Sequence, residues 1–575
     1  MIGVIARTSE RAAVEEFFEL FKTPWEFYRL GRQYDIIIAA GVDVPEVQTK
    51  LLLIYSSRTE ATDKRFGVVG GPCVRQISMD YRGTALPLYG DALTFDDASR
   101  GVACVKADSA TVGLEIRLPE VTVLRFGYDL FHEVQLLLSG AQPVEYAHVP
   151  TLDCHIEMLR SWILTAGINL LEIPPSPAGY SFIVCLTHDI DFIGIRQHKF
   201  DHSMWGFVYR STVGATLNFL TRRISFTRLL QIWRAVISLP LVYLGWANDF
   251  WSPFEWYLRL ENRLPATYFL IPFKGRPGKN VRTKDASKRA TAYDITDISE
   301  WTTTLSKQGC EISVHGIDSW HDVEAGREEL ARIAKVTRKS EIGIRMHWLL
   351  HDRNTFRVLE QAGYAYDSTL GYNETIGYRN ATTQAFRPDG AQTLLELPLH
   401  IQDGALFYPQ RLNLSEPEAW KRCAELIHNA QKVGGVLTIL WHDRSHGPER
   451  FWGDFYAKLL GELRTLDGWF GTAAEAVGWF QKRRQVRFEQ TELEDGSSQL
   501  QLLYDGEEIL PPLKIRVYSR TGSERNVVDF CWKSQVSSEK DPLLQQSLRF
   551  FAKFSEPQVQ DGTRQTKRQP ASAAK

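Results

Sequence analysis

The sequence lacks most of the features that would set it apart from ordinary globular proteins. It has seven cysteines in 575 residues, an odd number, and no two of them form a CxxC pair. Neither a disulfide framework nor a thiolate zinc site is therefore predicted. The opening residues, MIGVIARTSERAAVEEFF, lack the basic and apolar regions of a signal peptide, and we expect a protein of the reducing cytoplasm.

The sequence also lacks a strong excess of charge and a long apolar run. Its formal net charge is −2, which argues against nucleic acid as a partner. The most apolar stretch, residues 229–246, contains Arg234 and Pro240 and is too short for a transmembrane helix, which needs ~20 apolar residues. We expect a buried or interfacial helix there, with peripheral membrane contact through 229–246 as the alternative.

The pattern along the chain predicts several domains, as its length also suggests. Strand-like and helix-like segments alternate up to residue 150, and again from 179 to 483, which is typical of parallel sheets and barrels. A segment rich in Trp, Phe and Arg interrupts the second series. The predicted organisation is an N-terminal α/β domain (1–150), a helical connector (151–178), an α/β barrel-like domain (179–483) with a helical insertion (193–262), a small β-rich domain (484–555) and a disordered tail (556–575).

Two carboxylates follow the first strand of the second series. The run 180–186, YSFIVCL, reads as a buried strand, and Asp189 and Asp191 follow it. An unpaired buried charge is costly, so these residues are not core. Taken alone, the stretch fits an Asx-type turn with a helix cap equally well.

Polar residues also follow three further predicted strands of the same series. His315 follows the strand EISV, Arg345 ends the strand IGIR, and His442 follows the strand LTILW. Strand ends are where an α/β scaffold places its chemistry, so four such sets predict an active site. The neighbouring candidates are Asp318 and His321 after His315, His347 and Trp348 after Arg345, and Asp443 after His442.

The residue types indicate metal-assisted amide hydrolysis. One carboxylate and two imidazoles form an open site for Zn²⁺ or a similar ion. Such an ion polarises a carbonyl and lowers the pKa of bound water. A second carboxylate could act as general base, a separate histidine could protonate the leaving nitrogen, and an arginine could orient the base.

Residues 178–483 resemble the polysaccharide deacetylases, metal-dependent N-deacetylases with a distorted (β/α) barrel. The family's first motif, TFDDG, is met by Thr187-His-Asp-Ile-Asp191. Its second, H-[ST]-x-x-H, is met with a departure by residues 315–321, where Ser319 occupies the place of the second histidine and His321 lies six residues after His315. Its third, R-x-P-[WFY], is met by Arg345-Met-His-Trp348, with histidine in place of proline.

The resemblance implies a role for each matching residue. The branch with an HD-x-D first motif and an extra N-terminal domain is the most similar. The implied set is Asp189 as catalytic base, Arg345 as its orienting partner, His442 as catalytic acid, Asp191, His315 and His321 as metal ligands, with Asp318 as the substitute for His321, and Trp348, His347 and Asp318 as substrate contacts. The metal is expected to be Zn²⁺.

The resemblance implies an enzyme that removes an N-acetyl group from a sugar in polysaccharide or glycolipid biosynthesis. Its partner would be an N-acetylated carbohydrate or glycolipid. Two alternatives remain open at this point. The same residues would serve an amidase that acts on a nucleotide-sugar or another small amide, and the departure in the second motif leaves room for a non-catalytic glycan-binding scaffold.

Overall fold

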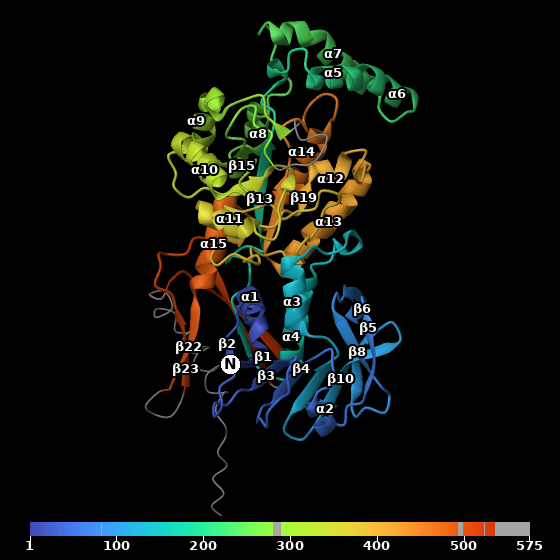
Figure 1. Ribbon diagram of the computed structural model, residues 1–575, viewed down its shortest axis with the longest axis vertical. Coiled ribbons are helices and arrows are strands. Elements are labelled where there is room, and N and C mark those ends of the chain that lie inside the picture. The colour runs from blue at the N-terminus through green and yellow to red at the C-terminus, as the bar shows by residue number, and fades with distance from the viewer. Residues whose placement is uncertain (82, 280–288, 493–497, 522–523, 535–575) are drawn as a thin grey trace, which may run out of the picture.

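The computed structural model describes residues 1–575 except 82, 280–288, 493–497, 522–523 and 535–575 (Figure 1). Its N-terminal part is built on an 11-stranded mixed sheet in which strands β2-β1-β3-β4-β11 run parallel and β10, β9, β6 and β7 extend the sheet antiparallel. The strands are β1 (Ile2–Ala6), β2 (Trp25–Phe27), β3 (Ile36–Ala40), β4 (Leu51–Tyr55), β5 (Gly70–Arg75), β6 (Ser78–Tyr81), β7 (Thr84–Pro87), β8 (Asp91–Phe95), β9 (Val102–Ala107), β10 (Ala110–Arg117) and β11 (Thr122–Phe126).

Helices connect and cover this sheet. The apolar faces of α1 and α3 belong to the same hydrophobic cluster as β1, β3 and β4. The helices of this part are η1 (Thr8–Glu10), α1 (Arg11–Phe21), α2 (Ala61–Phe66), α3 (Leu130–Ser139), η2 (Val144–Tyr146) and α4 (Thr151–Thr165). The predicted helical connector, 151–178, also contains a short strand, β12 (Leu170–Glu172).

The second large sheet has nine strands, every pair of them parallel, in the order β18-β17-β16-β15-β14-β13-β20-β19, with β21 beside β13. The strands are β13 (Phe182–Ile190), β14 (Ala266–Leu270), β15 (Glu311–Gly316), β16 (Ile344–Met346), β17 (Tyr366–Asp367), β18 (Leu395–Glu396), β19 (Ile401–Gln402), β20 (Val436–Leu440) and β21 (Gly468–Phe470).

The connection between β18 and β19 explains the curvature of this sheet. The two strands lie at opposite ends of the strand order, yet only residues 397–400 separate them in the chain. A link of four residues spans at most roughly 18 Å, so the sheet must curl until its ends approach each other. The result is a mixed α/β fold with a curled, parallel half-barrel, as the sequence predicts in outline.

Helices follow the strands of the half-barrel around its outside (Figure 1). Their ends follow local rules: α13 begins with a capping box between Ser415 and Glu418 and ends at Gly434, which has a φ of 89°. The helices are α8 (Phe254–Glu261), η6 (Ile295–Ile298), α9 (Ser299–Lys307), α10 (Val323–Thr337), η7 (His347–Leu349), α11 (Thr355–Ala362), α12 (Asp403–Phe407), α13 (Glu416–Val433), α14 (Trp452–Leu463) and α15 (Ala473–Gln485).

A helical insertion projects from one end of the molecule, opposite the N-terminal sheet (Figure 1). It leaves the half-barrel after β13 and returns at α8, within the predicted range 193–262. It consists of η3 (Ile195–Gln197), α5 (His202–Tyr209), the π-helical turn η4 (Arg210–Gly214), α6 (Ala215–Leu220) and α7 (Phe226–Tyr243). No helix in the described part of the chain is long and apolar enough to cross a membrane.

The C-terminal strands form two separate sheets where the sequence predicts one β-rich domain. Among the described residues, strands β22 (Arg487–Glu492) and β23 (Ser498–Leu503) pair only with each other, whereas β24 (Leu513–Thr521) lies between β25 (Glu524–Trp532) and β12. The connector strand therefore extends this sheet, which also packs against α15 through a shared hydrophobic cluster. The expected domain end at 555 and the expected tail 556–575 lie outside the described residues.

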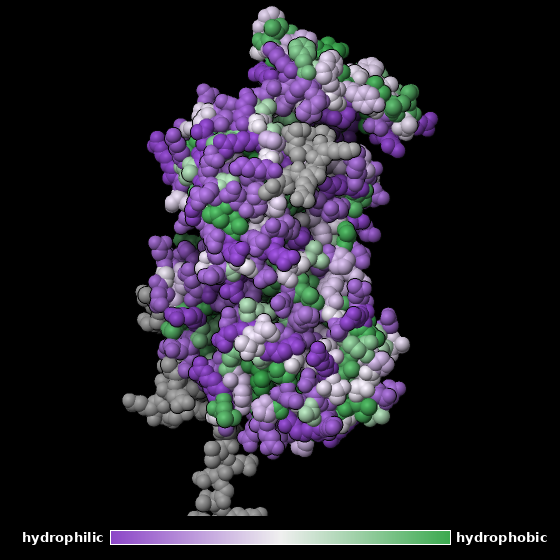
Figure 2. All heavy atoms as spheres, viewed as in Figure 1, coloured by the Kyte–Doolittle hydropathy of each residue, from purple (hydrophilic) through white to green (hydrophobic). Residues whose placement is uncertain are grey.

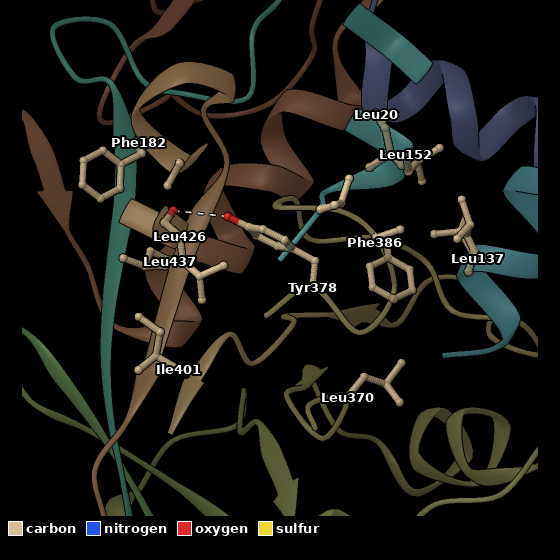
Figure 3. Close-up of a cluster of buried hydrophobic side chains, with 14 of the residues drawn as sticks. Leu20, Leu137, Leu152, Phe182, Leu370, Tyr378, Phe386, Ile401, Leu426 and Leu437 are labelled. Carbon is tan, nitrogen blue, oxygen red and sulfur yellow. Dashed lines mark hydrogen bonds between the residues drawn. The ribbon is translucent and has the colours of Figure 1, made fainter. Parts of the chain in front are cut away.

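One hydrophobic core runs from the N-terminal part into the half-barrel. Figure 3 shows Leu20 of α1 and Leu137 of α3 in the same cluster as Phe182 of β13 and Leu437 of β20. Tyr378 lies between them, and its hydroxyl donates to the carbonyl of Leu426 at 3.2 Å. Residues of the N-terminal part and of the half-barrel bury their apolar surface against one another, and this burial stabilises both. The two parts therefore form one packed body.

Candidate metal centre

The carboxyl ends of neighbouring strands bring the candidate residues together. Side chains alternate across a strand, so Asp189 near the end of β13 and Asp191 just beyond it share one face, and His188 takes the other. Strand β14 pairs with β13 on one side and with β15 on the other, and β16 follows β15 in the sheet. His315 of β15 is in register with Arg345 of β16.

Asp191, His315 and His347 form a group whose ligand atoms all lie within 4.8 Å of one another. The Oδ1 atom of Asp191 is 3.5 Å from Nε2 of His315 and 3.3 Å from Nε2 of His347. Ligands bound tetrahedrally to one ion at ~2 Å are roughly 3.3 Å apart. These three side chains therefore fit a divalent metal ion.

Hydrogen bonding supports this fit. The Nδ1–H of His315 donates to the backbone carbonyl of Arg345 at 2.9 Å, which leaves the lone pair on Nε2 for an ion. Asp191 Oδ1 and His347 Nδ1 are buried and have no hydrogen-bond partner within the described part of the chain. An unpartnered buried carboxylate oxygen between two imidazoles is costly without a cation.

The charges within the group affect one another. Burial alone would raise the pKa of Asp191, but the imidazoles of His347 and His315 outweigh it and hold that pKa below its usual value. Burial alone would lower the pKa of His315, and the carboxylates of Asp189 and Asp191 raise it overall. Burial lowers the pKa of His347 to about 3, so this imidazole is neutral and can act as a ligand.

Asp189 lies beside the group and is held by Arg345. The guanidinium donates to Asp189 Oδ1 at 2.9 Å and to the hydroxyl of Thr187 at 2.8 Å, and its remaining nitrogens donate to the carbonyl and hydroxyl of Ser368, each at 2.9 Å. Arg345 is fully buried. The second oxygen of Asp189, Oδ2, is 3.8 Å from His315 Nε2, so this carboxylate is fixed next to the ion site.

His442 approaches the group from β20 and is held by Asp403. Its Nδ1 contacts Asp403 Oδ1 at 2.5 Å, and its backbone N–H donates to Asp403 Oδ2 at 2.9 Å. Burial alone would lower the pKa of His442, but the carboxylate of Asp403 raises it to about 10, with smaller contributions from Asp189 and Asp191. His442 is therefore a protonated imidazole near both carboxylates.

The sequence did not reveal Asp403. It lies at the start of α12, directly after the two-residue strand β19 (Ile401–Gln402). No run of apolar residues marks so short a strand, and His442 is 39 residues away in the chain. The sequence around Asp403 offers one local signal: Leu399 and Ile401 are apolar residues in alternate positions, and the acidic Asp403 follows two positions later.

The structure does not bring His321 into the group formed by Asp191, His315 and His347. The carboxylate of Glu329 accepts hydrogen bonds from the backbone of Ile317 and Asp318 and from the hydroxyl of Ser319. This holds the loop after β15 against α10. His321 Nε2 consequently contacts Asp318 Oδ1 at 3.3 Å.

His347, expected as a substrate contact, occupies the place in the group that His321 was predicted to take. Asp318, the other candidate for that place, also stays outside the group, because its carboxylate accepts from the backbone of Lys279 at 2.9 Å. His188 packs beside the site, where its ring contacts Glu261, Tyr257 and the carbonyl of Trp441.

A cavity of about 340 Å³ opens over Asp191 and His347. Trp348 forms part of its wall, together with Arg210 and His202 of the insertion. Trp348 and Leu349 have φ values of 65° and 55°, a left-handed conformation that is uncommon for large side chains. Such strain is typical of functional sites, and here it turns the backbone directly after His347.

Comparison with known proteins finds similarity only among solved structures. No protein-family model matches the chain, and no curated protein matches it. Proteins assigned as polysaccharide deacetylases from Mycobacterium smegmatis and Pseudomonas aeruginosa PAO1 are 18% and 15% identical, cover 53% and 54% of this chain and 94% of their own, and have TM-scores of 0.32. PuuE allantoinase is 12% identical, covers 53% of this chain and 93% of its own, and has a TM-score of 0.31. At such low scores the likeness carries no weight for function, which rests on the geometry of the site.

Proposed function

We propose that the chain is a metal-dependent hydrolase that removes an N-acetyl group from a sugar. The observation that carries the proposal is one constellation at the strand ends. Asp191, His315 and His347 offer three ligands within 4.8 Å, Asp189 lies beside them on Arg345, and His442 lies beside them on Asp403. A base, an acid and an ion site together are the equipment of amide hydrolysis.

The donor set suits a divalent ion, and two imidazoles with one carboxylate favour Zn²⁺. Such an ion, when bound, supplies Lewis acidity toward the acetyl carbonyl and lowers the pKa of water at the site. Three protein ligands would leave a position open for substrate or water, which is typical of catalytic rather than structural zinc sites.

The chain's own residues account for both proton transfers. Asp189 accepts a proton from the attacking water as the new C–O bond forms, and Arg345 holds its carboxylate in a fixed orientation. His442 donates a proton to the amide nitrogen as the C–N bond breaks, which releases a free amine and acetate. Asp403 keeps His442 protonated for that step.

The cavity is consistent with a sugar substrate. Its volume of about 340 Å³ is at the lower end of the range for ligand pockets. Trp348 offers an aromatic face in the wall, which can pack against the apolar face of a sugar ring. Arg289 lines the same cavity, with its guanidinium 5.8 Å from the centre of the Trp348 ring.

The test is release of acetate from N-acetylated sugars by the zinc-loaded protein. Asp189→Asn is expected to reduce the rate about 10²- to 10⁴-fold, the usual contribution of a general base. Asp318→Asn serves as a matched control, because it changes a carboxylate that follows β15 and lies outside the group of Asp191, His315 and His347. Release of formate but not acetate would favour a different acyl group, and equal acetate release by wild type and Asp189→Asn would exclude the proposal.

A further inference from the structure

The helical insertion carries most of the exposed hydrophobic surface of the molecule. Of the 21 large hydrophobic side chains that are exposed in the described part of the chain, 13 lie between residues 200 and 246. Scattered single residues would need no explanation, but such a concentration marks an interaction surface. Figure 2 shows hydrophobic residues gathered on this projecting part. We name it the insertion surface, and its members are Phe200, Trp205, Tyr209, Val213, Leu217, Leu220, Phe226, Leu230, Trp233, Ile237, Leu241, Leu244 and Trp246.

Helix α7 is apolar on two sides. Leu229, Ile232, Leu239 and Val242 are buried within the molecule. A second stripe, which runs from Phe226 through Leu230, Trp233, Ile237 and Leu241 to Leu244, is exposed although its members recur every three or four residues on one helix face. The protein's own core therefore accounts for only one of the two apolar sides.

The exposed stripe continues into a groove. A cavity of about 570 Å³ lies between α7 and the segment formed by η4 and α6. Val213 and Leu217 line it from one side, and Trp233 and Ile237 line it from the other. The insertion surface is thus continuous across three helical elements rather than confined to one helix.

The charge of the central part of the insertion is entirely positive. Residues 202–248 contain no Asp or Glu and five arginines, at positions 210, 222, 223, 228 and 234. Arg228 pairs with Asp454 at 3.2 Å. Within the described part of the chain, no carboxylate pairs with Arg222, Arg223 or Arg234. Exposed aromatic and aliphatic side chains bordered by unpaired arginines are typical of helices that lie at the surface of a membrane.

We infer that the insertion surface docks on a lipid bilayer that contains anionic lipid. The apolar stripe of α7 would enter the boundary between headgroups and acyl chains, and Arg222, Arg223 and Arg234 would contact the anionic headgroups. The helices would lie on the bilayer, consistent with the absence of a described helix that could span it. The docking rests on the insertion alone and holds whether or not the proposed function is correct.

The orientation follows from the position of the insertion. His202, Ser203 and Arg210 line the cavity over Asp191 and His347, and α5 and η4, which carry them, run on into α6 at the insertion surface. A bilayer docked at α6 and α7 would therefore lie near the mouth of that cavity. The N-terminal sheet lies at the far end of the molecule (Figure 1) and would point away from the membrane.

The experiment is flotation of the full chain with phosphatidylcholine vesicles that contain 30% phosphatidylglycerol, at ~50 mM and at ~500 mM salt. The protein is expected to float at low salt, to float less at high salt because screening weakens the contact with headgroups, and to stay in solution with pure phosphatidylcholine. Trp233→Ser/Ile237→Ser and Arg222→Glu/Arg223→Glu are each expected to lower the bound fraction about tenfold or more.

Two matched controls separate docking from a general change of surface. Val527→Ser/Val528→Ser replaces exposed apolar residues on β25, and Arg353→Glu/Arg357→Glu reverses two exposed charges near α11; both are expected to float like the wild type. All these residues are exposed, so unchanged thermal unfolding verifies that the variants fold. No flotation of the wild type, or equal flotation with both lipids at both salt concentrations, would overturn the inference. So would a dimer in solution that Trp233→Ser/Ile237→Ser dissociates.

Discussion

At the scale of single residues, each of the two groups proposed to transfer protons has a partner of opposite charge beside it. Arg345 donates to Asp189, and Asp403 raises the pKa of His442 to about 10. His442 is consequently protonated at neutral pH. Such divergent environments are how one site keeps an acid and a base ready at the same pH.

The charge of Asp403 leads to a prediction about pH dependence. In the proposed mechanism His442 acts as an acid only while it is protonated, so activity is expected to be lost as the pH rises through the pKa of His442. Asp403→Asn removes the largest contribution that raises this pKa. The alkaline limb of the kcat/KM profile for acetate release is therefore expected to move to lower pH by about one unit or more. An unchanged alkaline limb would show that Asp403 does not act through His442.

At the scale of elements, the sequence predicted which strands carry the candidate residues but not how the chain turns after those strands. The strands that precede Asp191, His315 and His442 could be recognised in the sequence, because a buried strand appears as a continuous run of apolar residues. Arg345 ends such a run. The third member of the candidate metal-binding group, His347, depends on the turn at Trp348, whose left-handed conformation leaves no signal in the sequence.

Two further features depend on long-range contacts. Glu329 of α10 holds Ser319 and so the whole loop after β15, which keeps His321 away from His315. Asp403 reaches His442 across 39 residues. Local patterns contain no information about either contact, so these assignments required the structure.

Strand β16 gives a prediction about packing. A Cβ atom added at Gly343, just before β16, would lie 2.0 Å from the ring of Tyr366, whose hydroxyl donates to Glu311 at 2.7 Å. Gly343→Ala is therefore expected to lower the free energy of unfolding by about 1–3 kcal/mol, the usual cost of overpacking. Gly461→Ala in α14, where nothing lies within 4 Å of the added atom, is the matched control and is expected to be neutral or stabilising by roughly 1 kcal/mol. If denaturant unfolding showed that both variants lose the same free energy of unfolding, the packing account would be contradicted.

At the scale of the whole molecule, the free energy of unfolding depends on buried histidines that do not belong to the group of Asp191, His315 and His347. Burial lowers the pKa of His155 to about 4 and that of His400 to about 4. Both are neutral in the folded protein at pH 7. Below pH ~6.5 the unfolded chain binds protons that the folded chain does not, so stability is lost as the pH falls from about 6.5 toward 4.

His155→Gln is expected to reduce this loss. Lowering the pKa of one buried histidine from 6.5 to about 4 corresponds to at most ~3 kcal/mol. The difference in free energy of unfolding between pH 7 and pH 4 should therefore shrink by up to that amount in the variant. Urea unfolding at the two pH values measures it, with the exposed His148→Gln as control. A variant whose pH dependence equals that of the wild type would show that His155 is not the source.

The most direct test of the central claim is the metal content of the protein. We expect one equivalent of Zn²⁺ per chain by elemental analysis after exposure to zinc and removal of the excess. His347→Ala should lose it, because His347 belongs to the group with Asp191 and His315, and His321→Ala should retain it. Zinc retained in His347→Ala but lost in His321→Ala would contradict the account.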